Sequence, residues 1–246
     1  MKWIWFLGIA LLALSSFPGS ASVEDNQEEM ARGSNTEKYR YQAIPVDHQT
    51  SGKEVIEIEF IEAERGIEYH SRVIATGSFE EISIHLDKEA RFISGMRSIL
   101  QPPDTPVRQE RIWRDRQKVF VEKDTDGGFR KKEHQLPRDK ELAVDGSLLA
   151  MLKLFPFNEG KVWNLFMVDF SGYSITVTVR QEGREKISVP AGEFECYRLV
   201  TEVNIPLLKP KIIYWLWTQK PHFMVKQEGK RGPFTPSYIT SLVSFE

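Results

Sequence analysis

An alternation of apolar and polar residues dominates the chain after residue 54 and limits its fold more than any other feature. The period of two is clear in segments 55–61, 67–76 and 80–86. Successive side chains of a β-strand point to opposite faces, so this pattern predicts strands with one buried and one solvated face. The remaining segments predicted as strands are 90–99, 107–114, 118–124, 129–135, 161–169, 173–181, 185–189, 195–205, 211–218, 223–228 and 238–245.

The second and third of these strands can be aligned from the sequence. A turn at Gly77-Ser78 would place Tyr69 opposite Leu86, with the apolar residues of both strands on one face. A slip of one residue would move those side chains into water, and each contributes about 1.5–3 kcal/mol when fully buried. We therefore expect a hairpin with this register.

The same register predicts a pair of histidines on the polar face. His70 and His85 stand directly opposite each other, with Glu68 and Asp87 nearby in sequence. Two imidazoles at this distance resemble part of a metal site, but zinc normally takes three or four protein ligands. Short motifs of this kind occur by chance, so we interpret the pair as solvated histidines and predict no metal site.

One segment breaks the period of two. It begins with Asp145, a residue type that caps helices, and ends at Pro156, which stops them. Between them Leu148, Leu152 and Phe155 follow a helical spacing. The sequence therefore predicts one short helix with an apolar stripe.

These elements predict an all-β fold, mainly antiparallel: a strongly curved, partly open, barrel-like sheet with one short helix plugging it. A closed barrel of about eight strands is filled by its own side chains, and wider barrels leave space. A sheet of about a dozen strands must fold over, split in two or enclose a hollow. A helix roughly 15 Å long fills only part of that hollow, so a packed core or a ligand cavity must fill the rest.

The segment from Gly183 to Trp217 begins GREKISVPAGEFECYRL and ends in an aromatic strand. Pro190 fixes its own φ and Gly192 can adopt a positive φ, which predicts a tight reversal between two strands.

Together with the preceding helix, this segment resembles a family of exported bacterial proteins known as domain of unknown function 3108. The resemblance is good over 145–245 and is limited to the strand pattern over 55–142. The chain departs from the family at 205–210, where the family has a shorter loop. The matching positions are Phe155, Pro156, Gly160, Pro190, Ala191, Gly192, Phe194, Tyr214 and Trp215.

The resemblance implies an envelope protein with a curved antiparallel sheet similar to that of the outer-membrane lipoprotein carriers, whose concave face holds acyl chains. It implies no catalytic residue, because the family has no established activity.

The N-terminus predicts export. Lys2 precedes an apolar run over 3–14, and small residues follow up to Ala21. The run is short for a bilayer span, so we predict a cleaved signal peptide over 1–21 rather than an uncleaved anchor. A polar, acidic, flexible leader is predicted over 22–40, and a single curved β domain over 41–246. The expected location is the periplasm, with no integral membrane segment after cleavage.

Charge and cysteine content exclude further classes. The net charge of −2 lacks the basic surplus that nucleic acid binding requires. Cys196 is the single cysteine, so the chain can form no internal disulfide, and we expect a buried, unreactive thiol. No sequence motif of a catalytic or cofactor site is present, so we predict no enzyme activity, no catalytic residue and no cofactor.

Two functions remain open. In the first, the protein binds or carries a hydrophobic or lipid-like ligand in an apolar groove. In the second, it is a structural or partner-binding module of the cell envelope that docks another chain through exposed strand edges and the loop at Leu207-Leu208. An outer-membrane barrel is disfavoured because 107–118 has charges on both faces. The predicted ligand-binding residues are Leu148, Met151, Leu152, Phe155, Trp163, Trp215 and Trp217. These side chains could instead form the packed core.

Overall fold

The computed structural model describes residues 35–46, 52–75, 78–101, 105–125, 128–157, 160–205, 210–230 and 236–246. The predicted signal peptide, residues 22–34 of the predicted leader and the predicted docking loop at Leu207-Leu208 lie outside these ranges.

The described residues form fifteen strands and one short helix. In chain order these are β1 (Asn35–Pro45), β2 (Glu54–Ala63), β3 (Gly66–Ala75), β4 (Ser78–Leu86), β5 (Phe92–Gln101), β6 (Thr105–Asp115), β7 (Lys118–Thr125), β8 (Gly128–Gln135), β9 (Glu141–Val144), α2 (Ser147–Leu152), β10 (Val162–Val168), β11 (Ser174–Val189), β12 (Gly192–Val203), β13 (Lys211–Trp217), β14 (Met224–Lys230) and β15 (Ser237–Phe245).

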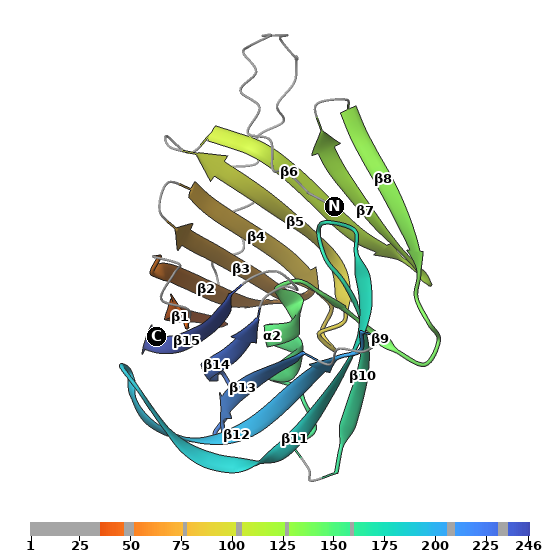
Figure 1. Ribbon diagram of the computed structural model, residues 1–246. Coiled ribbons are helices and arrows are strands. Elements are labelled where there is room, and N and C mark those ends of the chain that lie inside the picture. Colours follow the sequence, from red (N-terminus) through yellow and green to blue (C-terminus); the bar gives the residue numbers. More distant parts are fainter. Residues whose placement is uncertain are drawn as a thin grey trace. The chain divides into compact units, whose positions relative to one another are not determined.

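All fifteen strands belong to one sheet, which confirms the predicted fold class. The strand order is β8-β7-β6-β5-β4-β3-β2-β1-β15-β14-β13-β12-β11-β10-β9, so β8 and β9 are its edges and the sheet is not closed. Every pair is antiparallel except β9 with β10. β1 pairs with β15 in the middle of the sheet. Figure 1 shows the sheet curling so that α2 lies on its inner face.

The strand pattern differs from the prediction at three places. β1 begins at Asn35, inside the stretch assigned to the leader, because Tyr39, Tyr41 and Ala43 are buried between polar neighbours. β9 was not predicted, because its four residues are too few to show an alternation. The two predicted strands at 173–181 and 185–189 are one strand, β11, with a bulge. A bulge interrupts the alternation without ending the strand.

The predicted register of the β3–β4 hairpin is wrong by two residues. Tyr69 pairs with Ile84 instead of Leu86, and Ala75 pairs with Ser78. His70 consequently faces Ser83, not His85. A shift of two keeps every side chain on its face, so the apolar pattern cannot distinguish the two registers.

A helix forms in the predicted segment, but it is shorter than predicted: α2 has six residues, Phe155 lies beyond its end, and its N-cap differs. Gly146, not Asp145, occupies the N-cap position, and no side chain caps the helix. Gly146 has a φ of 88°, in the left-handed region that favours glycine. A Cβ there would lie 3.1 Å from Ile84 Cδ1 and 3.2 Å from Tyr69 Cε1. The close approach of the helix to β3 and β4 therefore requires this glycine.

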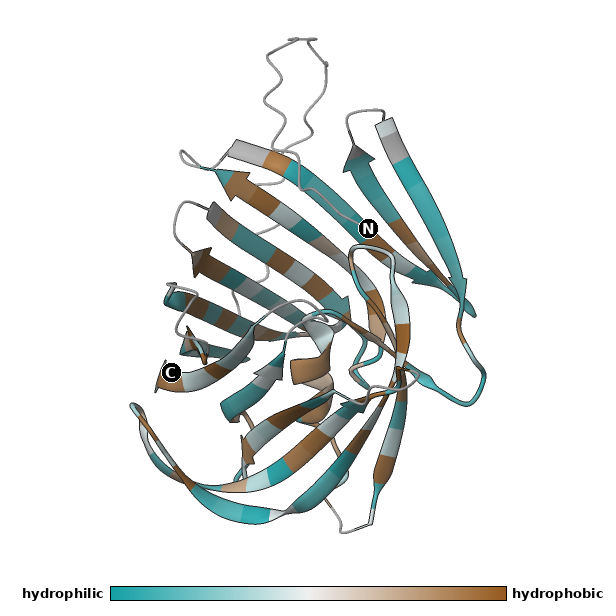
Figure 2. Cartoon of the chain, in the orientation of Figure 1, coloured by the Kyte–Doolittle hydropathy of each residue, from teal (hydrophilic) through white to brown (hydrophobic). Residues whose placement is uncertain are grey.

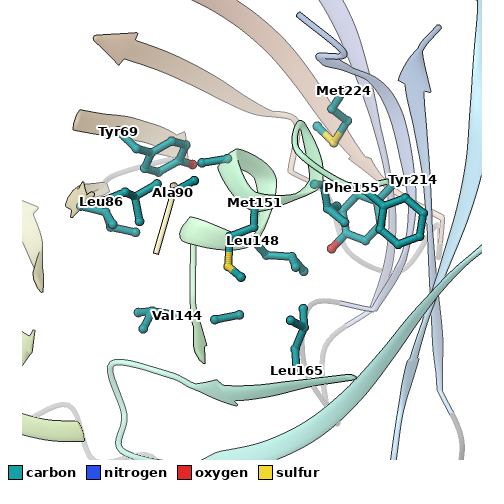
Figure 3. Packing of buried hydrophobic residues seen from close by; sticks show 14 of the residues in the cluster. Tyr69, Leu86, Ala90, Val144, Leu148, Met151, Phe155, Leu165, Tyr214 and Met224 are labelled. Atoms are coloured by element: carbon teal, nitrogen blue, oxygen red, sulfur yellow. The ribbon is translucent and has the colours of Figure 1, made fainter. Parts of the chain in front are cut away.

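Apolar side chains gather on the inner face of the sheet around α2. Figure 2 shows apolar and polar residues alternating along the strands. In Figure 3 the side chains of Leu148 and Met151 on α2 lie among residues from both halves of the sheet, including Leu86, Leu165 and Tyr214. These residues belong to one buried cluster, so a single core holds both halves together.

Candidate functional site

Four of the seven predicted ligand-binding residues are buried where α2 and the segment that follows it pack on the sheet. Leu148, Met151, Leu152 and Phe155 are 6%, 3%, 0% and 2% exposed. Leu154, which lies between Leu152 and Phe155, is 54% exposed and faces solvent. The helix has six residues, and isolated helices shorter than about 12–15 residues are marginal in water. Its position therefore depends on burial of these side chains.

Trp163 joins the helix stripe from β10. Its ring lies 5.8 Å from the ring of Phe155, in an edge-to-face arrangement. Phe157 also contacts Phe155, with 5.6 Å between the ring centroids, and stacks on Tyr197 at 4.3 Å. The structure thus brings five of the seven predicted residues together.

Trp215 belongs to the same buried cluster and Trp217 packs against it, but the ring and hydrogen-bond contacts of both are with other residues. Trp215 follows Tyr214 in β13, so the two side chains point to opposite faces of the strand. Trp215 donates a hydrogen bond from Nε1 to Glu185 Oε1 at 2.6 Å. Trp217 packs on other aromatic rings, those of Phe194, Phe223 and Phe245.

A cavity of about 750 Å³ lies elsewhere, over β1–β5 and the end of β15. Most of its side chains are charged or polar and alternate with residues of the core face, so it is a hollow of the outer face. None of the seven predicted residues lines it.

The charges of this outer hollow form rows across the strands. Arg40 stands opposite Glu57, Glu57 opposite Arg72, and Arg72 opposite Glu81. Ion pairs join Arg40 to Glu57 at 3.7 Å and Arg72 to Glu81 at 3.4 Å. Lys38 pairs with Glu59 at 3.3 Å in the next row. Cations and anions alternate here, so the hollow has no surplus of one sign for a charged ligand.

The two histidines share one carboxylate in place of facing each other. Glu68 Oε2 lies 3.4 Å from His70 Nε2, and Glu68 Oε1 lies 3.5 Å from His85 Nδ1. No group of three or more His, Cys, Asp and Glu side chains suited to a metal ion occurs in the part of the chain that the structure describes.

A buried ionic cluster on the inner face of β5–β7 was missed by the sequence analysis. Glu110 is 1% exposed and accepts hydrogen bonds from Arg97 and Arg108. Lys123 Nζ lies 3.7 Å from Glu110 Oε1. We call these four residues the Glu110 cluster. Three cations surround one carboxylate, so the cluster has a surplus of positive charge.

The Glu110 cluster lies on the same face as the apolar core. Glu110 shares its face of β6 with Ile112, which is buried in the core. The Arg97 guanidinium lies 5.4 Å from the ring centre of Phe170, another core residue. Segment 107–118 has charges on both faces, so its sequence gave no reason to single out Glu110.

Two further expectations concern Cys196 and the membrane. Burial raises the pKa of the Cys196 thiol to about 12, with smaller contributions from Glu195 and Glu185. The thiol is buried and donates a hydrogen bond to the Phe194 carbonyl, which agrees with the predicted unreactive residue. Within the described ranges, no helix has the length and apolar character needed to cross a bilayer.

Comparisons with known proteins give no family. No protein-family model matches the chain, so the predicted family resemblance is not supported by one, and no curated protein matches. A proposed lipoprotein from Parabacteroides distasonis is 10% identical, with a TM-score of 0.35 over 85% of this chain and 94% of that one. A proposed exported protein with a YmcC-like fold from Bacteroides fragilis is 12% identical, with a TM-score of 0.32 over 85% and 95%. Similarity this low carries no argument about function.

Proposed function

We propose that this protein is an exported, non-enzymatic binding protein or carrier of the periplasm, which holds a hydrophobic or lipid-like ligand on the inner face of its sheet. The observation that carries this proposal is α2: a six-residue helix without a side-chain cap, held on the sheet by its apolar stripe. The N-terminal sequence, with its predicted signal peptide, supports export.

The energies of helix and ligand packing are comparable. Leu148, Met151 and Leu152 each contribute about 1.5–3 kcal/mol by burial, or about 4.5–9 kcal/mol together. A ligand chain of about ten methylenes gains about 8 kcal/mol at about 0.8 kcal/mol per methylene. A hydrocarbon chain would therefore replace α2 on the sheet at little net cost. Met151 and the aromatic rings around Phe155 would adapt to its shape.

Native mass spectrometry of the mature protein, purified from the envelope in volatile buffer, tests this proposal. We expect a bound lipid, and we expect a fluorescent fatty acid to compete for the same site. Protein that carries no lipid and binds no fatty acid would refute the carrier function.

A variant pair separates displacement of α2 from binding elsewhere. Met151→Ala weakens the hold of the helix and should raise fatty acid affinity several-fold. Leu154→Ala changes an exposed side chain of the same segment and should leave affinity unchanged. Equal affinities in both variants would show that the ligand does not compete with α2.

The alternative function, a structural or partner-binding module, is favoured by the open edge of β8. However, β8 carries Arg130, Lys131 and Lys132, and charged edge strands resist pairing with other chains. Photo-crosslinking from position 130 in the native envelope tests this alternative. One reproducible protein adduct would favour it, and its absence would count against it.

A further inference from the structure

The Glu110 cluster has more cations than a structural ion pair needs. One guanidinium is enough to neutralise a buried carboxylate, and Arg97 already contacts Glu110 through Nε at 2.7 Å. Arg108 and Lys123 both approach the other oxygen, Oε1. The cluster therefore carries two positive charges beyond the one that pairs with Glu110.

The surplus cations are also the ones that reach solvent. The Glu110 side chain is 1% exposed and that of Arg97 is 13% exposed, whereas those of Lys123 and Arg108 are 23% and 40% exposed. Burial lowers the pKa of Lys123, and the charges of Arg108 and Arg97 lower it further, while Glu110 and Asp169 oppose the change. The cations of the cluster therefore repel one another, and an added anion would reduce this repulsion.

The positive charge continues along the same face to the edge of the sheet. Arg130 on β8 stands opposite Lys123, and Lys132 stands opposite Val121. Lys132 donates a hydrogen bond to the Gly172 carbonyl and lies 5.2 Å from the ring centre of Tyr173. Asp169, in the same segment between β10 and β11, acts on Lys123 as a second negative charge. With Lys132 counted, four cations face the two carboxylates Glu110 and Asp169.

The cluster connects to α2 through packed side chains of the inner face. Gly146 at the start of α2 is in close contact with Ile84. A Cβ at Gly95 on β5 would lie 3.2 Å from Ile84 Cγ1 and 3.3 Å from Phe170 Cζ. Phe170 in turn lies under the Arg97 guanidinium. Ile84 and Phe170 are fully buried, so packed core side chains connect the apolar region around α2 to the cluster.

We propose that Arg108 and Lys123 bind the anionic head group of the ligand, a phosphate, sulfate or carboxylate, while its hydrocarbon chain lies towards α2. This inference rests on the proposed carrier function and narrows it to anionic amphiphiles. Guanidinium and ammonium groups form charge-assisted hydrogen bonds with such oxygens, and these are stronger where water is partly excluded. Glu110 holds the cations in place and contributes no contact to the ligand.

Calorimetric titration of the mature protein with three probes tests the inference: decyl phosphate, decyl maltoside and inorganic phosphate, each below its micellar concentration where it has one. We expect decyl phosphate to bind at least about tenfold more tightly than decyl maltoside. Arg108→Gln should remove this difference. Arg111→Gln, on the same strand but the opposite face, should preserve it.

The outcomes separate the two proposals. Equal affinity for both decyl compounds, unchanged in Arg108→Gln, overturns the head-group site and leaves the carrier function. Binding of inorganic phosphate alone, lost in Arg108→Gln, supports the anion site but refutes the carrier. Binding of none of the three probes refutes both.

Discussion

The inner face of the sheet has two regions that differ in what covers them. Around α2, side chains such as Leu152 and Leu165 are fully buried, because the helix shields them from water. On β5–β7 the same face holds the Glu110 cluster, whose outer cations reach solvent. Both regions come from strands with the same alternation. The difference between them therefore lies in the covering helix α2 and not in the strand pattern.

The largest effect should come from breaking the apolar region. Leu152→Ala removes a fully buried side chain from α2 and should lower the free energy of unfolding by about 3–4 kcal/mol. Urea denaturation measures the change. Leu154→Ala, at an exposed neighbouring position, should change the stability by less than about 0.5 kcal/mol. Equal effects of the two variants would mean that α2 does not depend on its buried stripe.

Glu110→Gln breaks the charged region. The three cations lose their common anion, and we expect a loss of about 2–3 kcal/mol. This is less than for a fully buried pair, because Arg108 and Lys123 turn towards water. Added phosphate should restore part of the stability of Glu110→Gln and none of that of Leu152→Ala. A loss that phosphate does not change would argue that the cluster has no room for an anion.

A smaller effect is expected from the hydrogen bond between Trp215 and Glu185, which also contact Lys226 and Arg198. Trp215→Phe keeps most of the ring but removes the Nε1 hydrogen bond to Glu185, which should cost about 1–2 kcal/mol. Thermal unfolding followed by circular dichroism measures it. In Glu185→Gln the acceptor is neutral but still present, so the loss should be smaller; a larger loss would assign the effect to the charge of Glu185 rather than to this bond.

The smallest effect is expected on the outer face. Arg40 and Glu57 are 57% and 46% exposed at 3.7 Å, and exposed ion pairs contribute about 0.2–1 kcal/mol. Arg40→Gln should therefore lower stability by less than about 0.5 kcal/mol, and added salt should remove the difference. A loss as large as that of Glu110→Gln would show that burial does not separate the two ionic regions.

The sequence predicted those features that depend on local chemistry. Pro190-Ala191 forms the turn of the predicted hairpin, since Val189 pairs with Gly192. The stripe of α2 was predicted from its spacing, and in both cases the deciding residues lie within a few positions of one another. The open, curved sheet was predicted from the number of strands along the chain.

The features that the sequence could not predict depend on the exact register between neighbouring strands. Glu110 meets Arg97 and Lys123 only because β5, β6 and β7 align in one particular way. His70 and His85 were placed on the correct face but two residues out of step, which the apolar pattern tolerates. The ligand-binding role of the seven predicted residues stays a proposal, and the ring and hydrogen-bond contacts of Trp215 and Trp217 are with residues outside the other five.

The pairing of β1 with β15 has a consequence for how the molecule is made. These neighbours in the middle of the sheet are separated by nearly the whole described chain. The ribosome synthesises β1 early and β15 late. The strands on either side of this pair can therefore form their own pairs before β1 and β15 meet. Contacts so remote in sequence form slowly. The pairing of β1 with β15 is therefore expected to form last.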